Sequence, residues 1–134
     1  MEAKLENDAR CPCQSGESYA ACCGPLHRGE AHAPTAERLM RSRYSAFAVG
    51  DSAYLIETWH PSTRPGSLEL DPGMRWFSLE ILSRTAGGML DSHGVVEFRA
   101  RYRLHGEVGE QHEISRFVKE NRRWFYVKIG RAHV

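Results

Sequence analysis

Several features are scarce or missing in the 134-residue sequence, and each absence narrows the class of protein. No apolar run approaches the roughly 20 residues that a transmembrane helix needs. Residues 1–8 are charged and lack the apolar centre of a signal peptide. We therefore expect a cytoplasmic protein that does not associate with membranes. A nucleophile elbow, a phosphate-binding loop, a zinc-protease helix motif and a dinucleotide fingerprint are also absent, so no enzyme class is indicated.

The overall composition is that of an ordinary soluble domain. The hydrophobic share is 41% and the charged share is 26%, and a chain of this length can bury a self-supporting core. The net charge is +1, but residues 99–134 alone carry nine basic and four acidic side chains. This basic third predicts either contact with a phosphate or an acidic protein, or simply the solvated faces of strands.

Cysteine is absent outside residues 11–23, and the four cysteines there are closely spaced. Cys11 and Cys13 stand one residue apart, eight residues follow, and Cys22 and Cys23 are adjacent. Cysteines that served as small hydrophobic residues would be scattered, so the cluster indicates a metal site or a redox site. Because the cytosol is reducing, four clustered thiols favour a metal.

Zinc is the metal that we expect at this cluster. Structural zinc sites are tetrahedral and closed by four protein ligands, which four thiolates supply. A short helix over residues 17–23, ended by Gly24 and Pro25, would place the last two sulfurs about 100° apart around its axis. Zinc binding contributes on the order of 10 kcal/mol to the folding of such small modules. The alternatives are a strained disulfide between neighbouring cysteines and a redox dithiol.

Other polar residues lie close to the cysteines in the sequence. His27 and His32 are further donors, although four cysteines already complete a tetrahedral set. Four thiolates on Zn²⁺ leave a net negative charge, which we expect backbone N–H groups and either Arg10 or Arg28 to offset. Residues 24–34 are rich in proline and glycine and are expected to form a linker.

The segment after this linker has the pattern of two helices. Apolar side chains recur at helical spacing over residues 35–49, and the pattern resumes over residues 52–60 after the capping residue Asp51. Arg43 lies at the edge of the first apolar stripe, where we expect it to reach solvent or to pair with a carboxylate.

After these helices, the spacing of apolar residues changes from one in about 3.6 residues to every second residue, which predicts strands. Four segments qualify, namely residues 75–84, 95–104, 110–119 and 123–130. In the first of them, alternation places Phe77, Leu79 and Ile81 on one side and Trp76 on the other. Helices followed by a meander predict an α+β fold, with the helices packed on one face of a curved antiparallel sheet of about four strands. We expect a zinc knuckle with its linker at residues 1–33 and an α+β domain at residues 34–134.

The cysteine spacing resembles a known motif. C-x-C-x8-C-C is similar to the SEC-C zinc motif, which also occurs at the tail of the SecA translocation ATPase, where the last ligand is usually histidine. Gln14 stands where glycine is common, and Glu17, Ala20 and Ala21 stand where lysines are common. The resemblance implies zinc binding by the four cysteines. The missing lysines are those that would dock on acidic surfaces.

Three further stretches resemble the YchJ family of bacterial proteins. They are residues 35–47, residues 58–65 and residues 116–126. The resemblance implies a nuclear transport factor 2-like cone, in which a bent sheet wraps a helix and leaves a pocket. Longer members of that family carry a second cysteine cluster near the C-terminus, whereas this sequence has one cluster.

A concave pocket in such a cone is a common ligand site. In the third predicted strand, His112 and Arg116 alternate in phase with Ile114 and Val118. If that phase faces the helices, an imidazole and a guanidinium point into the interior and require partners. A structural ion pair or a one-residue shift of register would explain the same pattern. The candidate pocket residues are His60, Arg64, Trp76, His112, Arg116 and Trp124.

Three functions are consistent with the sequence. In the first, Cys11, Cys13, Cys22 and Cys23 hold a structural zinc in a knuckle that serves as a protein-interaction module on a cone-shaped scaffold. In the second, the cone pocket acts as an enzyme site or carries a small ligand, and an acid–base enzyme would need His112 or His60 paired with a carboxylate in the cone. In the third, the basic C-terminal third contacts nucleic acid or the ribosome, with the steep salt dependence that such binding shows.

Overall fold

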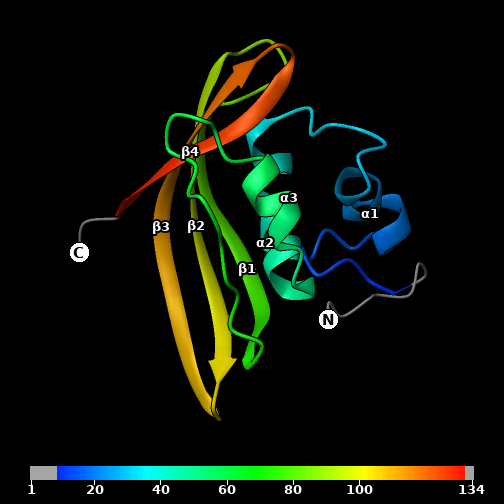
Figure 1. Cartoon of the computed structure of the whole chain (residues 1–134), viewed down its shortest axis with the longest axis vertical. Coiled ribbons are helices and arrows are strands. Elements are labelled where there is room, and N and C mark those ends of the chain that lie inside the picture. The colour runs from blue at the N-terminus through cyan, green and yellow to red at the C-terminus, as the bar shows by residue number, and fades with distance from the viewer. Residues whose placement is uncertain (1–8, 132–134) are drawn as a thin grey trace.

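The computed structural model describes residues 9–131, with side chains described as far as Lys128. The helices α2 (Ala36–Val49) and α3 (Ser52–Glu57) lie on one face of a sheet (Figure 1). Two short N-terminal elements, η1 (Tyr19–Ala21) and α1 (Cys23–His27), lie on the far side of α2 from that sheet. Within the described range, none of the helices combines the length and the apolar character needed to cross a bilayer.

The two predicted helices form where the capping residues place them. The Thr35 hydroxyl accepts a hydrogen bond from the Arg38 N–H at 3.1 Å and starts α2, and Gly50 ends it in the left-handed conformation, with φ of 81°. Helix α3 ends at Glu57, three residues before the predicted end. The backbone that follows pairs instead with the last strand, because the His60 N–H donates to the Tyr126 carbonyl at 2.7 Å.

The four predicted strands form one antiparallel sheet in the described part of the chain. Its strands are β1 (Met74–Ala86), β2 (His93–Leu104), β3 (Glu107–Glu120) and β4 (Arg123–Arg131), and they neighbour one another in chain order. The turn at His105 and Gly106 and the turn at Asn121 and Arg122 have positive φ at both residues, as tight antiparallel hairpins require. The sheet is open, with β1 and β4 at its edges, and the α+β prediction is confirmed.

A bulge in β1 changes which side chains face the helices. The pairing of β1 with β2 shifts between Trp76 and Ser78, so Trp76 and Leu79 both face the interior. Phe77 is 44% exposed and lies under the Arg103 guanidinium, 5.6 Å from ring centre to Cζ. The predicted grouping of Phe77 with Leu79 is therefore wrong, because strict alternation does not cross a bulge.

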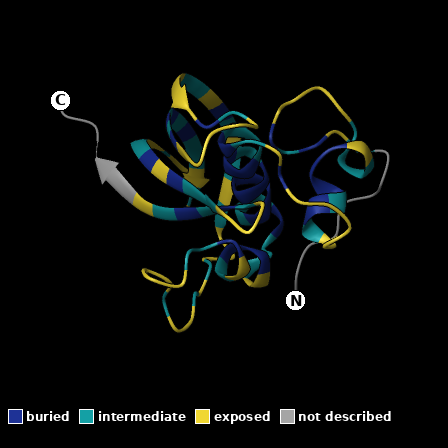
Figure 2. Ribbon diagram, turned by 90° about the horizontal axis from the view of Figure 1, so that it is seen from above, coloured by how far each residue is buried: buried dark blue, intermediate teal, exposed yellow. Residues whose placement is uncertain are grey.

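One hydrophobic cluster connects the sheet, the helices and the N-terminal segment. Phe117 and Leu39 are almost fully buried in it, and the four cysteines belong to the same cluster. In Figure 2, dark blue segments of the ribbon, which mark buried residues, occur in the sheet, in α2 and in the N-terminal segment. The division of the chain into two domains, at residues 1–33 and 34–134, stays a prediction.

Candidate metal centre and cone cavity

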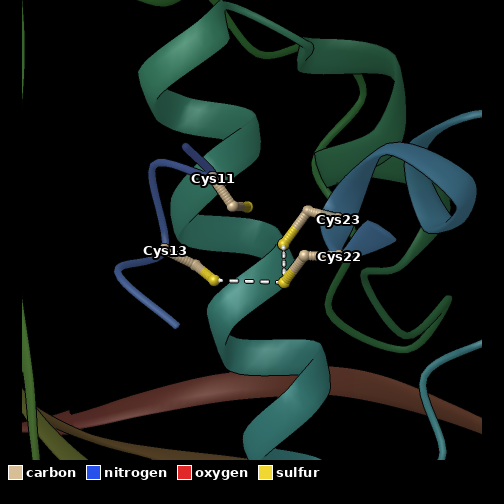
Figure 3. Close-up of side chains that lie close together, drawn as sticks. All are labelled: Cys11, Cys13, Cys22 and Cys23. Carbon is tan, nitrogen blue, oxygen red and sulfur yellow. Dashed lines mark hydrogen bonds between the residues drawn. The ribbon is translucent and has the colours of Figure 1, made fainter. Parts of the chain in front are cut away.

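Two tight turns bring the cysteine pairs together. In the first, the Cys11 N–H donates to the Glu17 carbonyl at 2.9 Å, and the Gln14 N–H donates to the Cys11 carbonyl at 3.1 Å. In the second, the Ser18 hydroxyl caps η1 by accepting from the Ala21 N–H. The chain then turns at Cys22, so that this residue and the next one point back toward the first pair (Figure 3).

The four sulfurs have the spacing of a tetrahedral metal site. All four lie within 4.8 Å of one another and are buried. The sulfur of Cys22 is 3.5 Å from that of Cys13 and 3.9 Å from that of Cys23 (Figure 3). Zinc–sulfur bonds of about 2.3 Å at tetrahedral angles place sulfurs roughly 3.8 Å apart, whereas a disulfide needs about 2.05 Å. All four thiols are free, and their arrangement fits one divalent metal ion.

The thiols influence one another's acidity. Hydrogen bonds from Cys13 and Cys23 lower the pKa of Cys11. The hydrogen bond with Cys11 in turn raises the pKa of Cys13 to about 11, and it also raises the pKa of Cys23. A cluster without a cation therefore keeps part of its thiols protonated, and a metal ion must displace those protons when it binds.

Two arginines of α2 face the cluster. Nη1 of Arg38 lies 3.8 Å from the Cys23 sulfur, and its Nη2 donates to the Cys22 carbonyl at 3.1 Å. Arg41 donates to the Cys13 carbonyl at 2.8 Å. Burial opposes the charge of Arg38, but its hydrogen bond to Cys23 and the charges of the nearby cysteines raise its pKa overall. These two guanidinium groups are placed to offset the negative charge of four thiolates.

The sequence pointed to other arginines for this task. Arg28 pairs with Glu30 at 2.7 Å in solvent, and Arg10 donates to the Gly16 carbonyl. Arg38 and Arg41 were missed because they lie off the apolar stripe of α2, where solvated arginines are expected. Their spacing of three residues, which places them on one side of the helix, was the available signal.

The nearby histidines do not join the sulfur cluster. The Nδ1 of His27 accepts from the Tyr19 hydroxyl at 2.6 Å, and its Nε2 donates to the Ser42 carbonyl at 2.8 Å. Burial lowers the pKa of His27, which keeps the ring neutral. Both of its nitrogens are thus engaged, while His32 is exposed and outside the metal-ligating group found among the described residues.

The helix expected over residues 17–23 is interrupted. It splits into η1 and α1 at Cys22, and α1 continues into the predicted linker as far as His27. Gly24 does not end a helix but lies inside α1, where an added Cβ would come within 2.7 Å of the Tyr19 carbonyl oxygen. The glycine is therefore needed for close approach of the two short helices, not for a left-handed cap.

Gln14 attaches the knuckle to the sheet. Its backbone is left-handed, with φ of 65°, the conformation in which glycine is usual. Its side-chain amide donates to the Phe77 carbonyl at 2.7 Å and accepts from the Leu79 N–H at 3.3 Å. Because β1 is an edge strand, this amide occupies backbone groups that have no neighbouring strand.

A second hollow feature lies between α2 and the inner face of the sheet. It is a cavity of about 190 Å³, called here the cone cavity. It is lined by Met40, Arg43, Tyr44, Phe47, Trp59, Trp76, Phe98, Ala100, Gln111, Glu113, Ser115 and Tyr126. Half of the lining residues are aromatic, and the lining comes from α2, from the segment after α3 and from all four strands. Of the six candidate pocket residues, Trp76 lines this cavity.

The structure places His112 and Arg116 outside the cavity. Both are exposed, and the His112 Nε2 lies 2.7 Å from the Glu97 carboxylate on the outer face of the sheet. The inward positions of β3 are instead Ser115 and Phe117, which are almost fully buried. The phase that was expected to face the helices faces solvent, as the one-residue alternative allows.

The other three candidates have structural contacts. His60 lies 3.0 Å from the Glu120 carboxylate, and Arg64 is exposed and donates to the Trp59 carbonyl at 2.9 Å. The Trp124 ring is buried, and its Nε1 donates to the Pro34 carbonyl at 3.1 Å. These contacts hold the loop after α3 and the start of α2 against the sheet.

The basic residues of β2 lie on the outer face among carboxylates. Arg99 pairs with Glu80 at 3.2 Å and with Glu110 at 3.3 Å, and Arg101 pairs with Glu110 at 3.1 Å. These cross-strand pairs neutralise much of the positive charge locally. They favour the reading of the basic third as a solvated sheet face.

The fold and the site together define a class of protein: an α+β cone with a four-cysteine knuckle at its N-terminus. Family models for the middle NTF2-like domain of YchJ and for the SEC-C motif match residues 35–129 and 9–25 respectively. The chain therefore belongs to the YchJ family, and its cysteine cluster is a SEC-C motif whose four cysteines are consistent with zinc binding.

Curated relatives and solved structures agree with this assignment. The chain is 55% identical to UPF0225 protein SCO1677 of Streptomyces coelicolor, over 87% of this chain and 90% of that protein. It is 50% identical to a UPF0225 protein of Chromobacterium violaceum, over 95% and 96%.

Two solved structures of SEC-C motif-containing proteins resemble the fold. The solution structure of RPA3114 from Rhodopseudomonas palustris has a TM-score of 0.79 and 35% identity, over 92% of this chain and 98% of that one. The crystal structure of a protein from Psychrobacter arcticus has a TM-score of 0.75 and 28% identity, over 97% and 88%. Both likenesses extend across the knuckle and the cone.

Proposed function

We propose that this chain is a zinc-binding protein whose metal is structural and whose knuckle presents a surface to a protein partner. The observation that carries the proposal is the set of four buried sulfurs at tetrahedral spacing. Four protein ligands close the coordination sphere of zinc, so no position is left for a substrate or a reactive water. The metal's role is then to hold the knuckle in shape.

The surroundings of the sulfurs support a structural role. Cys11 lies 3.4 Å from the buried Ser45 hydroxyl of α2, and Arg38 and Arg41 connect the same helix to the carbonyls of two other cysteines. The metal would therefore fix the N-terminal segment on α2. Residues 14–17, on the knuckle's first turn, are exposed and form the surface that a partner would meet.

Metal content tests the proposal directly. Protein purified without added metal or reductant is expected to contain one zinc per chain by elemental analysis, with four thiols titrated after denaturation in a chelator. The double substitution Cys22→Ser/Cys23→Ser is expected to lose the zinc. It should also lower Tm by roughly 15 °C or more, because zinc binding in such modules is worth on the order of 10 kcal/mol.

The matched control is the double substitution Ala20→Ser/Ala21→Ser, which adds the same two side chains directly before the cysteine pair. It is expected to retain zinc and to change Tm little. Protein that contains no metal and two disulfides would overturn the zinc assignment and favour a thiol redox function. Protein that binds zinc but melts identically without it would overturn the structural role.

The cone cavity favours a second function, the carriage of a small ligand. A cavity of about 190 Å³ with six aromatic residues in its wall is a site that a small organic molecule can fill. Binding of indole, followed by ligand-observed NMR, tests this function. Ala100→Leu, which narrows the cavity, is expected to weaken the signal, whereas Ala53→Leu on the exposed side of α3 is expected to leave it unchanged.

A further inference from the structure

Arg43 is a buried cation without a buried anion. Its side chain extends from α2 into the lining of the cone cavity and is 4% exposed. Its Nη1 donates to the Leu55 carbonyl and to the Thr58 hydroxyl, both at 2.7 Å. Among the described residues, no carboxylate forms an ion pair with it, and the partners of Nη1 are both neutral. The expectation that it reaches solvent or pairs with a carboxylate is therefore wrong for the chain by itself.

The guanidinium is held in a fixed position. Its Cζ lies 4.4 Å from the centre of the Tyr126 ring and 5.2 Å from that of the Trp59 ring. Burial lowers the pKa of Arg43 to about 10, which leaves it charged at neutral pH. A charge kept in an apolar interior is costly unless it is paired. The Leu55 carbonyl and the Thr58 hydroxyl at the end of α3 are neutral, so they offset only part of the free-energy cost of burying this charge.

Other polar groups of the lining also lack partners. The Tyr44 hydroxyl and the Trp59 indole nitrogen are buried and have no hydrogen-bond partner among the described residues. Both residues line the cone cavity together with Arg43. Arg43, Tyr44 and Trp59 thus place three hydrogen-bond donors in the cavity wall, in which six of the twelve lining residues are aromatic.

We propose that the cone cavity binds a small monocarboxylic acid with an aromatic or apolar body, whose carboxylate pairs with Arg43. This inference rests on the ligand-carrying function proposed above and names its ligand class. A guanidinium presents N–H groups in a planar fork that matches a carboxylate. The body of the ligand would lie against the aromatic rings of the wall.

Size and charge narrow the ligand further. An apolar cavity of about 150 Å³ holds one benzene molecule, so about 190 Å³ accommodates one ring with a short acidic side chain. Glu113 is the one carboxylate among the residues that line the cavity. A second acidic group on the ligand would approach this like charge, which is why a monoacid is expected rather than a diacid.

The experiment compares phenylacetate with its neutral analogue phenylacetamide, by titration calorimetry at fixed ionic strength on the zinc-loaded full chain. Phenylacetate is expected to bind at least tenfold more tightly than the amide. In Arg43→Met, phenylacetate should lose at least tenfold in affinity while the amide still binds. Arg116→Met, on an exposed arginine outside the cavity, is the control and should bind both probes as the unsubstituted chain does.

The possible results separate this inference from the function on which it rests. If both probes bind equally, or Arg43→Met binds phenylacetate normally, the carboxylate inference is wrong and the cavity remains a ligand site. If neither probe binds the unsubstituted chain, the carriage of small ligands fails as well. If Arg43→Met does not fold, Arg43→Lys keeps the charge but not the fork, and an intermediate affinity for phenylacetate is then expected.

Discussion

The knuckle and the cone cavity are both buried, but they are built from the chain in opposite ways. All four sulfurs of the knuckle come from residues 11–23, and two short turns bring them together. The cavity is lined by residues from 40 to 126, supplied by one helix, four strands and a loop. One site depends on local geometry, and the other depends on the complete tertiary structure.

This difference determines how amino-acid substitutions affect each site. The knuckle places its donors within one short segment, so a metal ion can organise it with little help. Arg38, Arg41 and Gln14 then attach it to α2 and β1. The shape of the cone cavity instead follows from the packing of side chains between α2 and the sheet. The predictions below separate the two sites by disturbing one and measuring both.

Among substitutions that leave the cysteines in place, the largest effect is expected from the core of the cone. Phe117→Ala removes an almost fully buried ring and should lower the free energy of unfolding by about 3–5 kcal/mol. At temperatures where this variant is still folded, it should retain its zinc, because the sulfurs are held by local turns. Urea unfolding and elemental analysis measure the two properties. The control Phe77→Ala removes a ring that is 44% exposed and should cost far less. Loss of zinc from folded Phe117→Ala would show that the knuckle is not locally organised.

The next effect concerns the charge around the metal. Arg38→Met removes the guanidinium beside the Cys23 sulfur and should weaken zinc binding about 10- to 100-fold, as changes to groups around metal ligands do. Competition with a chromophoric chelator measures the affinity. The matched control is Arg28→Met, since Arg28 pairs with Glu30 in solvent. Equal zinc affinities of the two variants would contradict the role assigned to Arg38.

Gln14 tests the attachment of the knuckle to the sheet edge. Gln14→Gly keeps the left-handed backbone but loses two hydrogen bonds to β1, which should cost about 1 kcal/mol. Gln14→Ala loses the same bonds and keeps the backbone strain of a left-handed residue with a β-carbon, about 1 kcal/mol, which glycine avoids. The alanine variant should therefore be the less stable of the two in thermal unfolding. The reverse order would show that the backbone conformation of Gln14 contributes nothing.

The smallest effect is a pH dependence. Burial lowers the pKa of His27 below its ordinary value of 6.5, so the unfolded chain takes up a proton at a higher pH than the folded chain does. Stability should therefore fall as pH falls through this range, by at most about 0.7 kcal/mol between pH 7 and pH 6. His27→Gln keeps a donor for the Ser42 carbonyl but cannot titrate. Its stability should change less over the same pH range, as measured by urea unfolding with zinc content monitored. Parallel pH profiles for both proteins would contradict a neutral His27.

Much of the fold could be predicted because its signals are local. Thr35 and Gly50 bound α2 by capping chemistry, and alternating residues located the four strands. The bulge after Trp76 was not predicted, because the segment still alternates and only pairing with β2 shows the shift. The shortening of α3 was missed for a similar reason, since its last residues pair with a strand about 65 positions later in the sequence.

The sequence by itself determined the sulfur cluster, because four cysteines within thirteen residues can meet around one ion through two turns. Only the tertiary structure decided which polar groups surround the two sites. His112 and Arg116 point outward because a strand's faces exchange with a shift of one residue, and register is set by partners on other strands. Arg43 is enclosed because helix α3 and two aromatic rings close over it. Local spacing specifies donors around a metal, whereas long-range packing specifies the environment of a buried charge.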